Sequence, residues 1–194
     1  MAVNPLVGRT TIEEFLAVES SSEQKHELYD GRVWAMSGAG EPHRSITPVL
    51  HRICGNALRG SHCRYFDQDT KVVIEEKNCS FYPDGGIACP PNLVDRTAGG
   101  IDNPRVLFEV LSPSTEAKDR GQKFEFYTSL PSLQDYVLIN TRHPRVEVFS
   151  RQADETWVLA IYLKGSVASI PSVGLDIPLD ELYEDAVFDE EPTD

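Results

Sequence analysis

The stretch Phe-Tyr-Pro-Asp-Gly-Gly-Ile, residues 81–87, decides the fold together with Val-Leu-Phe-Glu-Val-Leu, residues 106–111. The first stretch predicts that Asp84 stands at a strand end. The second predicts a strand that is apolar apart from Glu109, which follows Asp84 by 25 residues. A carboxylate in such a run is costly to bury unless it is paired. A divalent cation held by both acids would remove that cost, and such a metal is a common device for hydrolysing phosphodiesters.

A helix is predicted directly after the second stretch, over about residues 116–130. Ser112–Thr115 would cap its beginning, and Pro131 would end it. Asp119, Lys123 and Tyr127 recur every four residues within it, so they share one face of the helix.

Before these stretches, the sequence predicts a β-hairpin and a longer helix. Asp30-Gly31 between 26–29 and 32–36 is a strong signal for a type I′ turn, with Glu27 and Tyr29 on one face of the first strand. Apolar residues at helical spacing predict a helix over about 45–59. Pro48 is tolerated there if Thr47 caps the helix and Pro48 lies in its first turn.

The remaining patterns place further strands and two short helices around this centre. Residues 11–16 read as a helix with a capping box formed by Thr11 and Glu14. The expected strands cover 63–66, 71–75, 81–84, 86–89, 106–111, the apolar and central 136–139, and the antiparallel 145–149, 156–162 and 167–170; 90–104 reads as a loop and 180–186 as a final helix. The order predicts a single domain of the α/β (α+β) class, with one mixed sheet flanked by helices and additional antiparallel hairpins. Residues 187–194 are expected to be frayed.

The composition is that of an ordinary globular domain, with 40% hydrophobic and 25% charged residues among 194. No apolar stretch approaches the roughly 18 residues that a membrane helix needs, and the first residues show no secretory signal, so we expect a cytoplasmic protein. The four cysteines form no C-x-x-C pair, which argues against a structural zinc site. We expect them to be reduced.

The net charge of −13 is unusual for a protein that meets nucleic acid, because phosphate binding normally depends on basic residues. Residues 175–194 carry nine acids and no lysine or arginine; without them the chain has 22 acids against 18 bases, a net charge of −4. Several bases lie near the suspected site: Arg105, Lys118, Arg120 and Lys123. A catalytic metal would also supply positive charge that this count omits.

Taken in order, these motifs resemble a known family. The resemblance begins at residues 11–16, continues through 26–31, His43 and 82–84, is sharpest in 109–115 with Asp119, Lys123 and Tyr127, and closes with 135–139. The chain resembles the PD-(D/E)XK nuclease superfamily, and within it the Uma-two family of putative restriction endonucleases. The resemblance implies a restriction-endonuclease-like fold, a mixed sheet flanked by helices.

The resemblance also implies roles for individual residues. Asp84 and Glu109 match the two acids of the pattern and would be ligands of Mg²⁺, for which Mn²⁺ can substitute. The backbone carbonyl of Val110 is a further implied ligand, and Glu27 matches an early acid that completes the metal shell. The implied reaction is metal-assisted hydrolysis of DNA, without a covalent enzyme intermediate.

One position departs from the pattern. The lysine expected two residues after the second acid is replaced by Leu111. Lys123, on the next helix, is the implied replacement, because a helix can deliver an ammonium group to the same point from elsewhere in the chain. It would orient the attacking water or neutralise charge in the transition state.

Each of these residues also has a structural alternative. Asp84 before two glycines suits a turn, and Lys123 could simply pair with Asp119. Tyr127 could be a core residue with a satisfied hydroxyl, Glu27 a cross-strand partner of Arg32 or its neighbours, and His43 a cap or surface residue.

Three functions remain open from the sequence. The first is a Mg²⁺-dependent endonuclease acting on DNA, a reaction for which a symmetric homodimer is a reasonable expectation. The second is a non-catalytic binding or assembly module on a nuclease-like scaffold, which Leu111 and the acidity favour. The third is a metal-dependent hydrolase of a small phosphorylated substrate.

Overall fold

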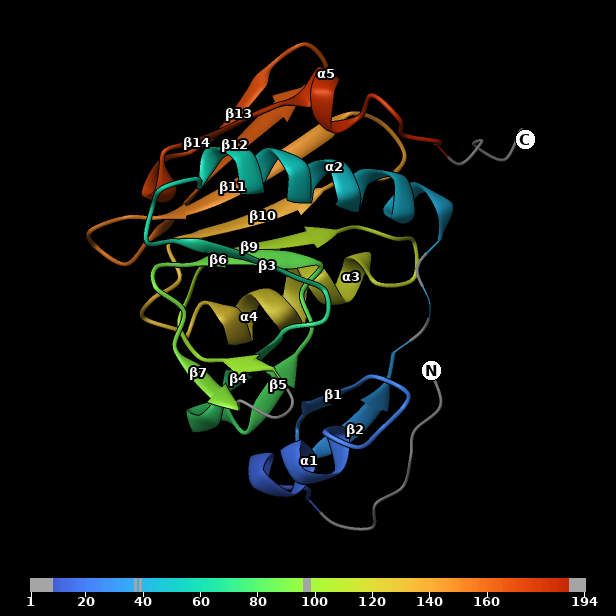
Figure 1. Cartoon of the computed structure of the whole chain (residues 1–194), viewed down its shortest axis with the longest axis vertical. Coiled ribbons are helices and arrows are strands. Elements are labelled where there is room, and N and C mark those ends of the chain that lie inside the picture. The colour runs from blue at the N-terminus through green and yellow to red at the C-terminus, as the bar shows by residue number, and fades with distance from the viewer. Residues whose placement is uncertain (1–8, 37, 39, 96–98, 189–194) are drawn as a thin grey trace.

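The computed structural model describes residues 9–36, 38, 40–95 and 99–188, and its centre is a six-stranded mixed sheet (Figure 1). The strand order of this sheet is β12-β11-β10-β9-β6-β3. Its strands are β3 (Arg64–Asp67), β6 (Gly85–Ala88), β9 (Pro104–Val110), β10 (Asp135–Ile139), β11 (Arg145–Arg151) and β12 (Trp157–Leu163). β9 and β10 run parallel and the other neighbours antiparallel. All five residues of β10 are buried, so the prediction of a central strand at 136–139 is confirmed.

A second six-stranded sheet lies beside the first, and the prediction of one sheet is therefore wrong. Its order is β2-β1-β5-β4-β8-β7, with β1 (His26–Tyr29), β2 (Arg32–Ala35), β4 (Lys71–Ile74), β5 (Cys79–Phe81), β7 (Leu93–Asp95) and β8 (Gly100–Ile101). A single turn of 3₁₀ helix, η1 (Glu75–Lys77), joins β4 to β5. The chain changes sheets between β5 and β6, at Tyr82–Asp84, where Pro83 has no N–H to continue a ladder. The predicted loop at 90–104 also contributes β7 and β8, although 96–98 lie outside the described residues.

Local signals near the N-terminus produce the elements that were predicted. Asp30 and Gly31 both have positive φ, 53° and 69°, as the type I′ turn between β1 and β2 requires. Helix α1 (Ile12–Glu19) begins with the predicted capping box: Thr11 N–H donates to Glu14 Oε2 (3.0 Å), and Glu14 N–H donates to Thr11 Oγ1 (3.3 Å).

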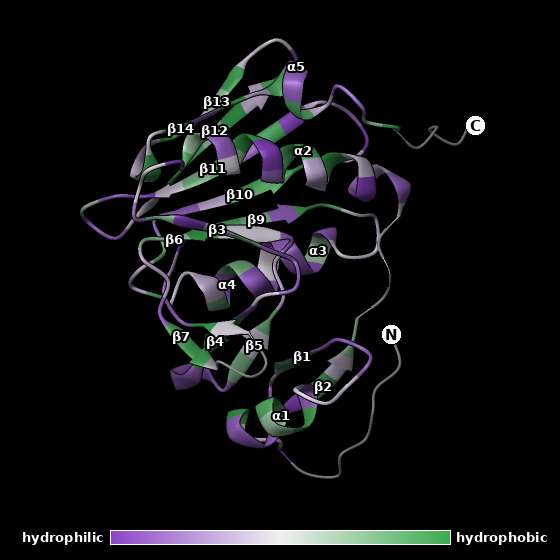
Figure 2. Ribbon diagram, viewed as in Figure 1, coloured by the Kyte–Doolittle hydropathy of each residue, from purple (hydrophilic) through white to green (hydrophobic). Residues whose placement is uncertain are grey.

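Helix α2 (Glu41–Ala57) covers one face of the central sheet (Figure 1). It begins earlier than predicted because Pro42 occupies its first turn, so Pro48 lies in the interior and Thr47 is not the cap. The Thr47 hydroxyl instead donates to the His43 carbonyl at 3.1 Å. Both hydrophilic and hydrophobic residues occur along the whole length of α2 (Figure 2). Its apolar stripe packs with the sheet and with β13 (Val167–Ile170), β14 (Leu175–Pro178) and α5 (Leu179–Leu182), while the 3₁₀ turn η3 (Pro171–Val173) joins β13 to β14.

The helical segment predicted at 116–130 contains a π-helical turn. It comprises α3 (Glu116–Lys118), the π turn η2 (Asp119–Lys123) and α4 (Phe124–Tyr127). A π turn leaves the helical hydrogen-bond pattern locally, and the Tyr136 hydroxyl donates to the Asp119 carbonyl at 2.9 Å. This segment packs between the two sheets, against a second core that includes Phe81, Leu107 and Tyr136.

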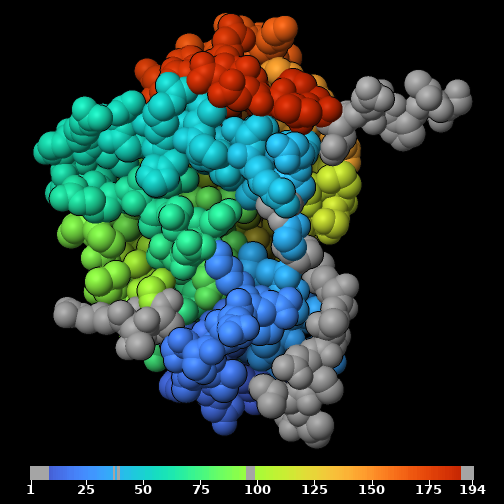
Figure 3. All heavy atoms as spheres, turned by 45° about the vertical axis from the view of Figure 1, so that its right-hand side comes forward, coloured from blue at the N-terminus to red at the C-terminus, as the bar shows by residue number. Residues whose placement is uncertain are grey.

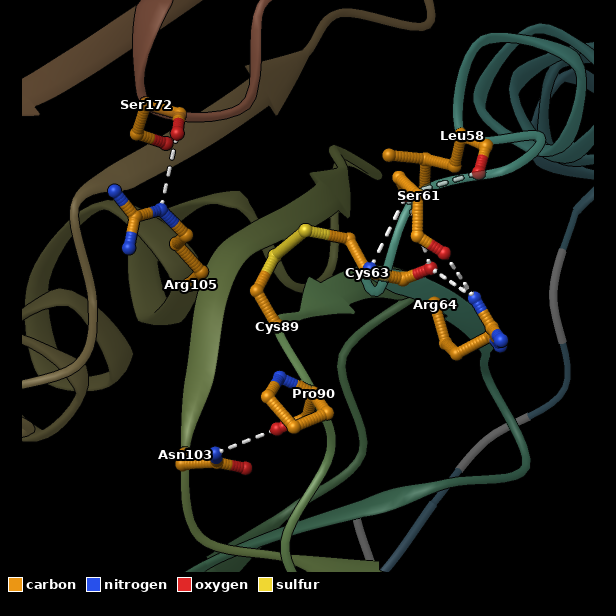
Figure 4. The surroundings of a disulfide bond; sticks show 9 residues. All are labelled: Leu58, Ser61, Cys63, Arg64, Cys89, Pro90, Asn103, Arg105 and Ser172. Carbon is orange, nitrogen blue, oxygen red and sulfur yellow. Dashed lines mark hydrogen bonds between the residues drawn. A yellow bond between two sulfur atoms is a disulfide. The ribbon is translucent and has the colours of Figure 1, made fainter.

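The expectation that all cysteines are reduced is wrong for two of them. Cys63 and Cys89 form a disulfide (Figure 4). Cys54 and Cys79 are free and buried. The reason is strand register: β3 pairs with β6 through Arg64 and Ala88, so Cys63 and Cys89 are the next cross-strand neighbours, with Cα atoms 4.0 Å apart. A separation of 26 residues concealed this proximity in the sequence.

At the C-terminus, Val187 is exposed and Phe188 packs on Tyr183, with ring centroids 5.9 Å apart. The rest of the predicted frayed end, 189–194, lies outside the described residues. None of the helices in the described ranges is both long and apolar enough to cross a membrane.

Candidate active site

A cleft of about 610 Å³ opens where α2, the hairpin side of the second sheet and the end of β9 meet. In Figure 3 the α2 segment lies above the N-terminal residues on one face of the molecule. Six of the predicted site residues line this cleft: His43, Asp84, Glu109, Val110, Asp119 and Lys123. The structure therefore brings together residues that are far apart in the chain.

Asp84 lies where the chain enters β6, and both of its carboxylate oxygens have partners. Oδ2 accepts a hydrogen bond from the Val110 N–H at 2.7 Å, and Oδ1 lies 2.7 Å from His43 Nε2. His43 is 9% exposed in the first turns of α2, so it is not the surface residue that the structural alternative envisaged. Asp84 is thus held between the end of β9 and the beginning of α2.

The Val110 carbonyl faces the same side of β9 as Asp84. The N–H and C=O of one strand residue point to the same side, and the Val110 N–H points at Asp84. The next residue, Leu111, donates in the opposite direction, to the Ile139 carbonyl at 2.8 Å. The backbone direction is therefore compatible with the carbonyl ligand that the sequence predicts.

Glu109 is buried, with 2% of its surface exposed, and points toward the helical segment. Its Oε1 accepts hydrogen bonds from Lys123 Nζ at 3.0 Å and from the Tyr127 hydroxyl at 3.2 Å. Tyr127 is fully buried as a core residue, yet its hydroxyl contacts the acid of the site. The structural alternative, a core residue with a satisfied hydroxyl, is therefore confirmed, and that hydroxyl lies beside Glu109.

Lys123 lies among three carboxylates. Its Nζ is 3.0 Å from Glu109, 3.3 Å from Asp119 and 3.4 Å from Glu27. The ammonium group therefore reaches the acids from the helical segment, and its contacts extend well beyond Asp119, the only partner in the structural alternative.

Glu27 is 5% exposed and lies between two lysines. Lys118 contacts its second oxygen, and Lys118 also stacks 4.4 Å above the Tyr29 ring centroid. Opposite Glu27 in the hairpin is Trp34, a neighbour of Arg32, but the carboxylate pairs with the two lysines rather than across the hairpin. Lys118 was visible in the sequence only as one of several bases near the site. Nothing in the spacing indicated that it would reach back to the hairpin.

Burial and charge shift the pKa values of these groups in different directions. Burial raises the pKa of Glu109 well above its usual value despite Lys123, and the neighbouring Asp119 and Asp84 add to the rise. Burial likewise raises the pKa of Asp119. Burial also opposes ionisation of Glu27, but Lys123 and Lys118 outweigh it and lower the pKa. Burial alone would lower the pKa of Lys123, whereas Glu109 and Glu27 reverse this effect and raise it.

The donor atoms suit a hard divalent cation in kind. Glu27, Asp84, Glu109 and Asp119 supply carboxylate oxygens, and Mg²⁺ prefers oxygen ligands. Asp119 Oδ1 is buried, and its partner is Lys123 Nζ at 3.3 Å, an ion pair without hydrogen-bond geometry. Within the described ranges, however, no three cleft side chains bring ligand atoms within 4.8 Å of one another. Lys123 and His43 hold the carboxylates, so a bound cation would have to draw Glu109 and Asp84 away from them.

A hydrogen-bonded chain behind the cleft was not foreseen. Tyr82, two residues before Asp84, donates its hydroxyl to Glu19 at 3.0 Å, and His26 Nδ1 lies 3.0 Å from the other Glu19 oxygen. These hydrogen bonds hold Tyr82 in the cleft wall. The pairing of Glu19 with His26 joins α1 to β1, and no sequence periodicity connects those elements.

Comparison with known proteins gives the same classification for nearly the whole chain. The family model Uma2, described as "Putative restriction endonuclease", matches residues 12–180. Two proteins of Synechocystis, both called uncharacterized, are similar: slr1290 is 34% identical over 91% of this chain and 92% of its own, and sll1609 is 33% identical over 77% and 85%.

A crystal structure from Anabaena variabilis, described as "a putative nuclease belonging to DUF820", has the same fold. Its TM-score is 0.72 at 17% identity, and the match covers 90% of this chain and 97% of that one. At this identity the likeness concerns the fold alone. Together, the family match and the two relatives show that this chain belongs to the Uma2 family of putative restriction endonucleases.

Proposed function

We propose that the protein is a metal-dependent endonuclease that hydrolyses phosphodiester bonds of DNA. The observation that carries the proposal is the meeting of Asp84, Glu109 and Lys123 in one cleft, although Leu111 occupies the usual position of the lysine. The family and the nuclease-like fold support the same reaction class.

In this proposal Asp84, Glu109 and the Val110 carbonyl hold Mg²⁺ or Mn²⁺, and Glu27 is the nearby acid available to complete the shell. The cation would supply polarisation of a phosphoryl oxygen and a lower pKa for a water molecule. Lys123 would hold a positive charge beside Glu109 and could orient the attacking water or offset charge that develops in the transition state. His43 and the Val110 N–H position Asp84, and Tyr127 and Asp119 position Glu109 and Lys123.

The cleft wall also suits a phosphate backbone despite the acidity of the chain. Ser112, Ser114 and Thr115 line it, and the Ser112 hydroxyl lies 3.1 Å from the Ser114 hydroxyl and 3.0 Å from the Thr115 hydroxyl. Hydroxyl and backbone N–H groups make many of the contacts between proteins and DNA phosphates. Neutral donors of this kind allow binding without a basic surface.

The test is cleavage of plasmid DNA by the purified protein in Mg²⁺, in Mn²⁺ and in a chelator. We expect nicking or linearisation only with the metals, and a loss of at least about 10²-fold in Asp84→Asn and in Glu109→Gln, because each removes a charged ligand. Glu13→Gln, an exposed carboxylate on α1, is the matched control. Unchanged cleavage by both site variants would refute the assignment.

The net charge of −13 favours one second candidate, hydrolysis of a small phosphodiester. It would use the same acids, so the same variants test it. Metal-dependent turnover of bis(p-nitrophenyl) phosphate without cleavage of plasmid or single-stranded DNA would favour this candidate over the first.

A further inference from the structure

Exposed apolar side chains gather at one edge of the central sheet. Among the described residues, nine large hydrophobic side chains are exposed, and five of them lie on β12 and the adjoining β13: Val158, Leu159, Ile161, Leu163 and Val167, at 44–55%. β12 itself, Trp-Val-Leu-Ala-Ile-Tyr-Leu, contains no charged residue and no proline. Natural edge strands usually carry such residues to prevent pairing with another chain.

The opposite edge of the same sheet is protected in that way. β3 is four residues long and has Arg64 and Asp67 at its ends. β12 is seven residues long, and β11 is its only strand partner within the described part of the chain. A long, unprotected and apolar edge is the feature expected of a strand that acquires a partner.

The register of the sheet shows which backbone groups of β12 are free to pair. Asn140 N–H donates to the Arg145 carbonyl, and Arg151 N–H donates to the Gln134 carbonyl. Because the side to which the backbone groups point alternates along a strand, the odd-numbered residues of β11 bond to β10 and the even-numbered residues bond to β12. In β12, Val158, Ala160 and Tyr162 therefore bond to β11. The N–H and C=O groups of residues 157, 159 and 161 therefore point outward without a partner on β11. The N–H of Leu163 does so too, whereas its carbonyl accepts a hydrogen bond from the Ser166 N–H at 3.0 Å.

We propose that β12 pairs antiparallel with β12 of a second copy of this chain, so that two central sheets join across a two-fold axis. Antiparallel pairing of one strand with itself is isologous and closes at two copies. Only one register uses all four outward residues: it places 157 opposite 163 and 159 opposite 161, with the axis at Ala160. This register gives the homodimer a specific interface.

Charge complementarity supports the same register. Asp154 and Glu155 precede β12, and Lys164 follows it. In the proposed pairing Lys164 of each copy lies opposite Thr156 and near the acidic turn Asp154–Glu155 of the other copy; Glu155 pairs with Arg151 of its own chain, yet its side chain is 74% exposed. Parallel pairing would instead bring like charges together at both ends.

The axis residue provides a direct test. Ala160 would face itself in a non-hydrogen-bonded pair, with Cα atoms about 4.5 Å apart, within the roughly 4.4–6.8 Å range that a disulfide spans. We expect Ala160→Cys to form a covalent dimer on mild oxidation. Val158→Cys is the control, because it would face residue 162 of the other copy and lie about 13 Å from itself at the strand rise of about 3.3 Å per residue. Equal cross-linking of the two variants, or none in Ala160→Cys, would overturn the register.

Sedimentation equilibrium tests the surface independently of any cross-link. The wild-type protein should have twice the 21.6 kDa mass of one chain, and Leu159→Lys with Ile161→Lys should reduce the mass to that of one chain. Leu93→Lys with Val94→Lys changes equally exposed residues on β7, the edge of the other sheet, and should leave the dimer intact. Circular dichroism would verify that both double variants are folded. A monomeric wild type, or dissociation by the β7 variant alone, would refute the proposal.

Discussion

At the scale of single residues, Glu109 shows most directly how burial and charge oppose each other. Its pKa is raised above the usual 4.5, so the folded state holds a proton that the unfolded state releases. The stability from this proton is fully present below about pH 4.5 and is lost as the pH rises through the folded pKa, by at most about 1.4 kcal/mol per pH unit. Relative to the wild type, Glu109→Gln should therefore gain free energy of unfolding as the pH rises above about 4.5. Urea denaturation across this range would check it, and parallel pH profiles would contradict it.

Lys123 carries a second prediction at the residue scale. Lys123→Met leaves Glu109, Asp119 and Glu27 without their shared ammonium group, and breaking a buried pair in this way costs about 3–5 kcal/mol. Adding Glu109→Gln should restore part of the loss, because one of the uncompensated charges is then removed. Denaturation of both single variants and the double variant measures the coupling, with the exposed Lys77→Met as control. Additive losses would show that the pair is not coupled.

The site residues were predictable from the sequence to different degrees. Asp84 and Glu109 could be found because each interrupts a recognisable pattern, and the spacing of Asp119 and Lys123 indicated a shared face. The partners of these residues could not be found in the same way. Lys118 meets Glu27 across 91 residues, and His43 meets Asp84 from another element, so both contacts depend on tertiary packing.

At the scale of elements, the π turn at Asp119–Lys123 is the feature on which the site depends most, because it carries both residues. Tyr136→Phe removes the hydroxyl that donates to the Asp119 carbonyl and should cost about 1–2 kcal/mol. We also expect it to lower nuclease activity, since the turn positions Lys123. Tyr183→Phe is the matched control: its buried hydroxyl donates to the Asn140 and Arg145 carbonyls, away from the cleft. Equal effects of both variants on activity would argue against a positioning role for the turn.

Elements that local chemistry specifies were predicted well, and elements that tertiary contacts specify were not. The type I′ hairpin and the capping box depend on residues within a few positions of each other. The π turn depends on a hydroxyl from β10, and α2 continues through Pro48 because its apolar stripe is buried against the sheet. A single periodic pattern could not reveal either outcome.

At the scale of the whole molecule, the Cys63–Cys89 disulfide joins neighbouring strands at one edge of the central sheet. A disulfide between cysteines 26 residues apart should stabilise the fold by about 3–4 kcal/mol, chiefly because it restricts the conformations of the unfolded chain. Cys63→Ser should therefore lower the free energy of unfolding by that amount. Dithiothreitol should have the same effect on the wild type and none on the variant. If the reductant leaves the wild-type stability unchanged, the disulfide does not contribute to stability.

The division into two sheets could not be predicted from the sequence, because it too depends on tertiary contacts. Strand patterns predicted most strands, but alternation along one strand does not specify which other strand it joins. Pro83 marks the point of exchange, and only the assembled fold shows that β5 and β6 belong to different sheets.

The central position of Lys123 has a final consequence for how the protein is made. Its ammonium group is a covalently attached counterion for the buried carboxylates, so it is present as soon as the chain is synthesised. The protein can therefore fold without a bound metal. Small zinc domains differ, because their ligands come together only when the zinc ion binds. Under the proposed function, the folded protein would be inactive until the cation is supplied.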